Sequence, residues 1–227
     1  MTRVETVVLD MAGTTVADDG LVLGAFELAW NRLHPHESED RRSAAITHVI
    51  TTMGQSKIEV FRGLVDEDRA HELNAAFESA LDELVEAGRV APIAGAEAAI
   101  RELRAEGRSV VLTTGFSRVT AEGILRVLGW QGLADGLCTP ADAGRGRPYP
   151  GMVLLAGAHT QISSVDALAV VGDTESDAQS GVNAGAGLIA GVLTGDHADE
   201  ARLRAAGAQH VIASVADLPA LLRELGR

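Results

Sequence analysis

The sequence predicts an α/β protein in which a doubly wound, mostly parallel sheet forms a Rossmann-like core and carries an inserted helical cap. Short apolar runs alternate with helical spacing along residues 91–227, which is typical of βα units. One further apolar run, residues 7–10, reads as a buried strand near the N-terminus. The stretch between them, residues 18–90, has helical periodicity and no convincing strand. We therefore expect residues 1–17 and 91–227 to form the core and residues 18–90 to form the cap.

The expected elements follow from apolar spacing and from the glycines and prolines that end each segment. Four helices are expected in the cap, at residues 21–33, 37–53, 56–64 and 66–87. In the core we expect strands at 7–10, 110–112, 137–139, 167–171, 188–193 and 211–212, helices at 96–105, 120–128, 149–157, 177–184, 198–206 and 215–225, and a polar turn at 141–146.

Composition narrows the classes of partner. The 227 residues are 46% hydrophobic, which provides a sizeable core, and the net charge of -13 disfavours nucleic acids and anionic membranes. Cys138 is the only cysteine, so an intrachain disulfide is excluded. The first ten residues lack the apolar core of a signal peptide, and no run approaches a membrane span. We expect a cytoplasmic protein that acts on a small molecule, with a homodimer as one option.

The first strand ends in a carboxylate, Asp10, followed by small and hydroxylated residues. In open α/β sheets, ligands bind at the carboxyl edge of the strands. Gly13 lets the backbone approach a ligand, and Thr14 offers a hydroxyl and an amide to an anion. Asp10 is therefore a candidate nucleophile or metal ligand, and the alternative is that it only caps the next helix.

Three predicted strands end in reactive groups, namely Asp10, Thr113 and Asp173. A fourth signal is Arg147, in a basic loop. Carboxylates from two strand ends suit Mg²⁺, which takes oxygen ligands, while a hydroxyl and a guanidinium suit phosphoryl oxygens. This combination is sufficient for phosphoryl transfer to a carboxylate.

These motifs, in this order, resemble those of the haloacid dehalogenase-like hydrolase superfamily. Asp10 matches the aspartate nucleophile, Thr113 the hydroxyl of the second motif and Arg147 the basic residue of the third. Residues 172–177 match the acidic fourth motif.

The resemblance implies a hydrolase with an aspartyl-phosphate intermediate and bound Mg²⁺. It places Asp10, the carbonyl of Ala12 and Asp173 on the metal; Asp177 is either a further ligand or a hydrogen-bonding partner around the metal. The residues expected to bind substrate are Ala12, Gly13, Thr14, Met53, Gly54, Thr114 and Gly115.

The first motif resembles one branch of the superfamily, the phosphonatases. Phosphatase members usually have a second aspartate, the general acid, two residues after the nucleophile, where this chain has Ala12. Residues 147–150 and 171–174 look similar to the phosphonatase branch as well. The cap segment 53–57, Met-Gly-Gln-Ser-Lys, resembles the Met-Gly-x-x-Lys segment whose lysine forms a Schiff base with the substrate aldehyde, a role that falls on Lys57.

One position departs from the pattern: Val60 stands where the branch has a histidine three residues after the lysine. His48 lies in the preceding helix, and nothing in the sequence shows that it substitutes. Three functions therefore stay open. The first is cleavage of a small phosphonate such as phosphonoacetaldehyde. The second is hydrolysis of a small phosphate monoester (phosphoglycolate-like), with Lys57 as a binding cation or simply a solvated helix lysine. The third is a catalytically weak relative that binds a metabolite or a protein partner.

Overall fold

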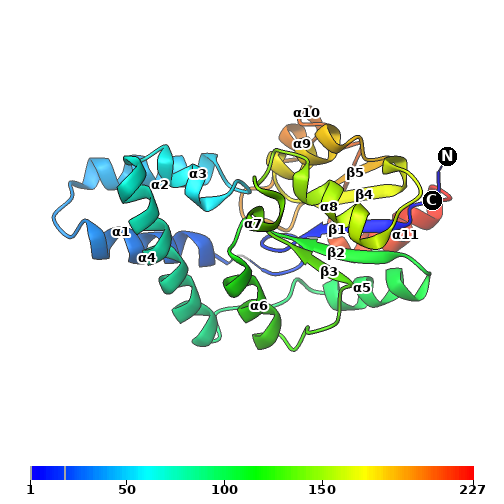
Figure 1. The fold of residues 1–227 in the computed structure, drawn as a ribbon, viewed down its shortest axis with the longest axis horizontal. Coiled ribbons are helices and arrows are strands. Elements are labelled where there is room, and N and C mark those ends of the chain that lie inside the picture. The colour runs from blue at the N-terminus through cyan, green and yellow to red at the C-terminus, as the bar shows by residue number, and fades with distance from the viewer. Residues whose placement is uncertain (1, 18) are drawn as a thin grey trace.

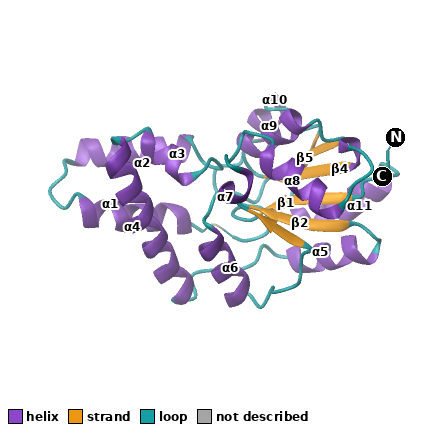
Figure 2. Cartoon of the chain, in the orientation of Figure 1, coloured by secondary structure: helices purple, strands orange, loops and turns teal. Residues whose placement is uncertain are grey.

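The fold is a six-stranded parallel sheet covered by helices, with four further helices at its side (Figures 1 and 2). The computed structural model describes residues 2–17 and 19–227. The strand order is β3-β2-β1-β4-β5-β6, and every neighbouring pair is parallel. The predicted α/β class is thereby confirmed. The strands are β1 Thr6–Asp10, β2 Ser109–Thr113, β3 Gly136–Cys138, β4 Leu168–Gly172, β5 Leu188–Val192 and β6 His210–Ile212.

Both faces of the sheet are apolar because helices cover both. Val8, Val111 and Val170 belong to the cluster packed under α8 (Gly151–Thr160), whereas their neighbours Leu9 and Leu112 belong to the main core. Side chains alternate between faces along a strand, so a sheet buried on both sides reads as a continuous apolar run. The remaining helices of this part are α5 Ala96–Ala105, α6 Arg118–Val127, α7 Pro140–Ala143, α9 Glu175–Ala184, α10 Glu200–Ala205 and α11 Leu218–Glu224.

The helices α1 Leu21–Leu33, α2 Glu39–Thr51, α3 Lys57–Arg62 and α4 Glu67–Glu86 form a separate lobe beside the carboxyl edge of the sheet (Figure 1). Its centre is aromatic: the Phe26 ring lies 5.5 Å from that of Trp30 and 6.0 Å from that of Phe61, and Phe61 lies 5.5 Å from Phe77. Each large ring buries a large apolar area, so a few of them contribute strongly to the core of a small lobe. Side chains of Ser38 and Asp66 accept the amide hydrogen bonds that begin α2 and α4.

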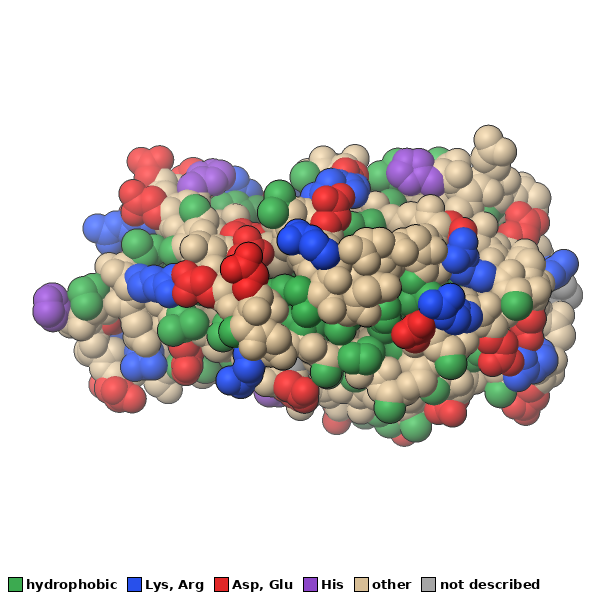
Figure 3. All heavy atoms as spheres, turned by 90° about the horizontal axis from the view of Figure 1, so that it is seen from below, with side chains coloured by type: hydrophobic (Ala, Val, Ile, Leu, Met, Phe, Trp, Pro, Cys, Tyr) green, Lys and Arg blue, Asp and Glu red, His purple; other side chains and the backbone are tan. Residues whose placement is uncertain are grey.

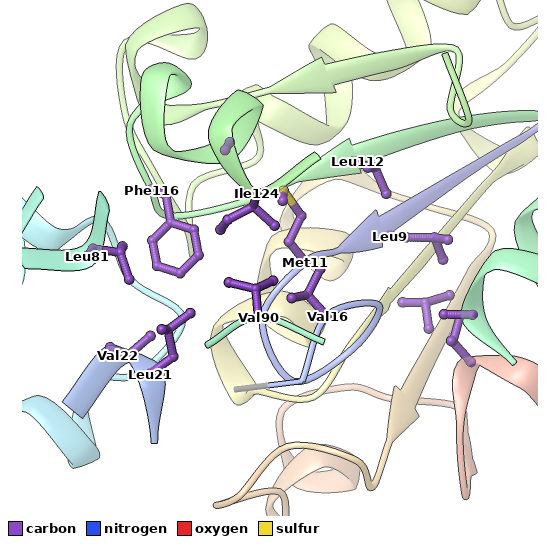
Figure 4. Close-up of a cluster of buried hydrophobic side chains, with 14 of the residues drawn as sticks. Leu9, Met11, Val16, Leu21, Val22, Leu81, Val90, Leu112, Phe116 and Ile124 are labelled. Carbon is purple, nitrogen blue, oxygen red and sulfur yellow. The ribbon is translucent and has the colours of Figure 1, made fainter. Parts of the chain in front are cut away.

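Two neighbouring chain segments join this helical lobe to the sheet. Val16 pairs antiparallel with Pro92. The amide of Ala17 donates to the carbonyl of Ala91 at 2.9 Å, and the amide of Ile93 donates to the carbonyl of Thr15 at 2.9 Å. Figure 4 shows the apolar contact beside this junction. Phe116 lies between Ile124 of α6, which packs beside the sheet, and Leu81 and Val22 of the helical lobe.

Most predicted elements occur with bounds shifted by up to three residues, and two differ in kind. The expected polar turn at 141–146 overlaps the one-turn helix α7, which begins at Pro140 with a reciprocal capping box between Thr139 and Asp142. The expected last helix at 215–225 starts as a 3-10 turn, Val215–Asp217, before α11.

Among the described residues, no helix is both long and apolar enough to cross a membrane. On the face seen in Figure 3, acidic and basic side chains are interspersed.

Candidate active site

Three carboxylates meet at the carboxyl edge of the sheet. Asp10 ends β1, Asp173 follows β4 and Asp177 lies in the first turn of α9. The register of the parallel strands brings these ends together, with Asp10 opposite Thr113. One oxygen from each carboxylate lies within 4.8 Å of the others, and all three side chains are buried.

The cluster is electrostatically strained without a metal ion, even though Arg147 lies beside it. Burial raises the pKa of Asp10 to about 7, with the attraction of Arg147 opposing and the repulsion of Asp177 adding to this effect. Burial also raises the pKa of Asp173 well above its ordinary value, and the charges of Asp10 and Asp177 raise it further. Three converging oxygen donors fit a hard divalent cation such as Mg²⁺.

Arg147 is a cation in contact with this cluster, and it is only 5% exposed. Its Nη2 donates to Asp10 Oδ1, and also to Thr113 Oγ1 at 3.0 Å. Its Nε lies 2.8 Å from Asp177 Oδ1, and its Nη1 donates to the carbonyl of Gly54 at 3.4 Å. A buried guanidinium needs such a set of partners to offset its desolvation. Arg147 therefore joins the predicted nucleophile, the second motif and the helical lobe.

Asp177 combines two contacts. Its Oδ2 accepts from the amide of Thr174 at 3.1 Å and from the Thr174 hydroxyl at 2.5 Å, so it forms the capping box that begins α9. Its other oxygen contacts Arg147. Both of its oxygens are therefore engaged by protein donors.

The turn after β1 fits closely against Asp173. Gly13 has a φ of +81°, and a Cβ there would overlap the Asp173 carboxylate. Thr14 donates from its hydroxyl to Asp173 at 3.1 Å. Thr194, after β5, donates to the carbonyl of Gly13 at 2.6 Å, and Gly195 is so close to Asp173 that it has no room for a Cβ either. Sequence reasoning missed Thr194 and Gly195, although both follow an apolar strand at the same edge of the sheet.

A cavity of about 70 Å³ lies between this edge and the helical lobe. Of the residues singled out from the sequence, the following line it: Asp10, Ala12, Met53, Gly54, Lys57, Thr114, Gly115, Arg147 and Asp173. The other four, Gly13, Thr14, Thr113 and Asp177, do not line it and instead contact those that do.

Lys57 is the first residue of α3 and is 5% exposed, so it is not a solvated helix lysine. Its Nζ lies 5.9 Å from the centroid of the Phe116 ring, within reach of a cation–π contact. It lines the same cavity as Asp10 and Arg147. The structure thus brings a buried amine from the helical lobe to the edge that carries the carboxylates.

The segment before Lys57 is seated on three loops of the sheet. Gly54 has a φ of +80°, and a Cβ there would overlap the Thr174 side chain. A Cβ on Gly115 would lie 2.7 Å from the carbonyl oxygen of Gln55, and one on Gly146 would lie 2.8 Å from the Cβ of Ser56. Such approaches need glycine, so these glycines allow the lobe to close on the cavity.

His48 is engaged away from the cavity. Its Nε2 lies 2.9 Å from the carbonyl oxygen of Val60, and its ring is so close to Gly63 that a Cβ there would lie 2.6 Å from it. Val60 is itself buried. His48 therefore connects α2 to α3, and it is not among the residues that line the cavity.

Sequence reasoning missed the outer wall of the cavity. The lining includes Thr174 and Glu175 of the fourth motif, and beyond the predicted site it includes Phe116, Asp196, His197, Asp199 and Arg202. Four of these follow β5, whose polar loop gave no motif. Glu175 and Arg202 form an ion pair at this wall.

Comparison with known proteins agrees with this geometry. The family model for haloacid dehalogenase-like hydrolases matches residues 4–185. A phosphonoacetaldehyde hydrolase from Bacillus cytotoxicus is 33% identical over 206 residues, and the match covers 85% of this chain and 77% of the relative. One from Bacillus cereus is 31% identical over 207 residues, with the same coverage.

Solved structures share the fold over nearly the whole chain. A phosphonoacetaldehyde hydrolase-like protein from Oleispira antarctica superposes with a TM-score of 0.85 at 24% identity, covering 100% of this chain and 94% of its own. An HAD family hydrolase from Deinococcus radiodurans, solved with bound phosphate and sodium, gives a TM-score of 0.70 at 26% identity, covering 98% and 96%.

Proposed function

Since this chain belongs to the haloacid dehalogenase-like hydrolases, and within them to the phosphonatase-like branch, we propose that it cleaves the carbon–phosphorus bond of a small phosphonate such as phosphonoacetaldehyde. The reaction would use Mg²⁺, an aspartyl-phosphate at Asp10 and a Schiff base at Lys57. The observation that supports this proposal is the buried position of Lys57 in the wall of the cavity that Asp10 also lines.

The phosphoryl half of the reaction takes place at Asp10. Its carboxylate attacks phosphorus, a P–O bond forms and the P–C bond breaks. Thr113 and Arg147, which contact one another and the end of β1, hold the phosphoryl oxygens. Water then attacks the acyl phosphate, which releases phosphate and regenerates Asp10.

The carbon half takes place at Lys57. A phosphate ester leaves as an alkoxide, whereas a phosphonate would leave as a carbanion, which is a far worse leaving group. An iminium between Lys57 and the substrate aldehyde takes up the electron pair of the broken P–C bond and becomes an enamine. No acid is then required beside the nucleophile, which agrees with Ala12 at that position.

The residues that would hold Mg²⁺ are Asp10 and Asp173 with the carbonyl of Ala12, and Asp177 supports the cluster through Thr174 and Arg147. When bound, the ion neutralises carboxylates that would otherwise repel the phosphoryl group and polarises its oxygens. Substrate contacts are assigned to Ala12, Gly13, Thr14, Met53, Gly54, Thr114 and Gly115.

The remaining assignments belong to the same proposal. Residues 18–90 act as a cap over a core made of residues 1–17 and 91–227. The partner is a small phosphonate or phosphorylated molecule, with neither nucleic acid nor membrane involved. The location is cytoplasmic, and a homodimer stays an option.

A second candidate is a phosphatase for a small phosphate monoester. It is favoured by Val60, which leaves the position of the branch histidine apolar and buried. In that case Lys57 binds the substrate as a cation.

Release of inorganic phosphate decides between the two. The protein is incubated with phosphonoacetaldehyde and with a panel of phosphate monoesters, each with Mg²⁺ and with chelator. We expect release from phosphonoacetaldehyde that stops in chelator. Release from monoesters alone would support the phosphatase, and full activity in chelator would exclude the metal from both.

A further inference from the structure

The proposed function requires proton transfers beside Lys57, and this inference rests on it. Water must leave the carbinolamine that Lys57 forms with the aldehyde, and the enamine carbon must be protonated after P–C cleavage. The branch histidine is replaced by Val60. His48, the nearest histidine in the sequence, is bound to the Val60 carbonyl and does not line the cavity. Another group has to move these protons.

The titratable residues of the cavity wall have other partners, with one exception. Asp10 and Asp173 belong to the carboxylate cluster. Glu175 is paired with Arg202. Asp196 accepts from the amide of Gly20 at 3.2 Å, and Asp199 accepts from that of Arg202 at 2.8 Å, where it begins α10. The exception is His197: in the described part of the chain, no hydrogen bond or ion pair involves its ring.

The loop that carries His197 is anchored on both sides. The hydroxyl of Thr194 donates to the carbonyl of Gly13, in the turn after β1. The carboxylate of Asp196 accepts from the amide of Gly20, directly before α1 in the helical lobe. Asp199 fixes the other end. His197 is thus presented at the mouth of the cavity, where it is exposed to solvent. The charged groups around it on this wall are Glu175, Asp196, Asp199 and Arg202, with Lys57 deeper in the cavity.

We propose that His197 is the proton-transfer group for the Schiff-base half of the reaction. The Lys57 amine adds to the aldehyde carbon, and the carbonyl becomes a hydroxyl. Protonated His197 gives its proton to that hydroxyl, the C–O bond breaks, water leaves and the iminium remains. His197 then takes up a proton from solvent. After P–C cleavage it gives this proton to the enamine carbon, which forms an iminium again. Water hydrolyses this iminium to acetaldehyde and the Lys57 amine. An imidazole can both give and accept a proton, which suits both transfers.

The test measures imine formation separately from turnover. Protein in chelator is mixed with phosphonoacetaldehyde and borohydride over a range of pH, and the mass adduct on Lys57 is followed with time. His197→Gln is compared with wild type and with His159→Gln, a matched control because His159 is an exposed histidine on α8 that does not line the cavity. Phosphate release with Mg²⁺ gives kcat and KM for the same proteins.

We expect His197→Gln to trap about 10²-fold more slowly than His159→Gln and to lower kcat with little change in KM. Added imidazole should restore part of the rate in His197→Ala, since the loop is open to solvent. Equal trapping rates in His197→Gln and the control would overturn the inference, as would a slow variant that imidazole does not rescue. If the proposed function is wrong, the wild type itself forms no adduct on Lys57. That result is distinct from a slow His197→Gln variant, and it would also exclude the role of His197.

Discussion

The carboxylate cluster predicts that removal of the proposed nucleophile stabilises the metal-free protein. In Asp10→Asn, a neutral amide replaces a carboxylate that is only 4% exposed. Burial raises the pKa of Asp10 to about 7, against an ordinary value of 3.8. The folded protein therefore binds the proton more tightly than the unfolded chain does. The contribution of Asp10 to the stability of the metal-free wild type should fall as pH rises from about 4 to about 7 and then stay level.

The magnitude follows from the same values. The pKa of Asp10 in the folded protein lies about three units above its ordinary value, and each unit is equivalent to about 1.4 kcal/mol. Ionised Asp10 therefore lowers the free energy of unfolding by roughly 4 kcal/mol above pH 7. This figure already includes the attraction of Arg147, which lowers the pKa. Arg147 keeps Asp177 and Thr113 as partners in the variant. At about 2–4 °C per kcal/mol for a chain of this size, Asp10→Asn should raise Tm by about 10 °C at pH 8 in chelator and hardly at all at pH 4.

Thermal unfolding in chelator at the two pH values measures this effect. Asp142→Asn is the control of opposite sign: burial would raise the pKa of Asp142, but hydrogen bonds from Thr139 and Arg118 outweigh it and hold the pKa below its ordinary range. That variant should lose stability at pH 8. If the control behaves as expected and the Tm of Asp10→Asn at pH 8 is no higher than that of wild type, the carboxylate cluster is not strained.

Two further predictions concern the proposed metal site and the contact between the helical lobe and the sheet. Asp173→Asn removes one of the converging oxygens, so Mg²⁺ binding measured by calorimetry should weaken by more than about tenfold; unchanged affinity would place the ion elsewhere. Gly54→Ala puts a Cβ into the Thr174 side chain at a φ of +80°, so it should raise KM and lower Tm. Gly88→Ala is its control, because φ there is +74° and the added Cβ meets nothing within 4 Å; similar effects in both variants would show that the contact with Thr174 is unimportant.

The sheet and most candidate site residues were predictable because their signals are local. Asp10, Thr113 and Asp173 stand directly after apolar runs, and parallel strands bring such ends together. Helix α1 begins and ends where its apolar spacing and the break at His34–Pro35 predicted.

The rest depends on contacts between distant segments. Nothing local to residues 193–199 shows that this loop closes the cavity, because its partners Gly13 and Gly20 lie about 180 residues away. The same holds for His48, whose engagement with the Val60 carbonyl appears only when α2 and α3 pack together. The helix α7 was missed because its polar composition reads as a turn, although Pro140 and the Thr139–Asp142 pair are a start signal.

The central claim is that Lys57 forms a covalent imine with the substrate, and mass spectrometry after borohydride trapping tests it most directly. With phosphonoacetaldehyde, the reduced adduct should be found on Lys57 in wild type and be absent in Lys57→Arg, which should also fail to hydrolyse the phosphonate. An unmodified Lys57 after trapping, together with turnover of phosphate monoesters by wild type and by Lys57→Arg, would contradict the claim and establish the phosphatase instead.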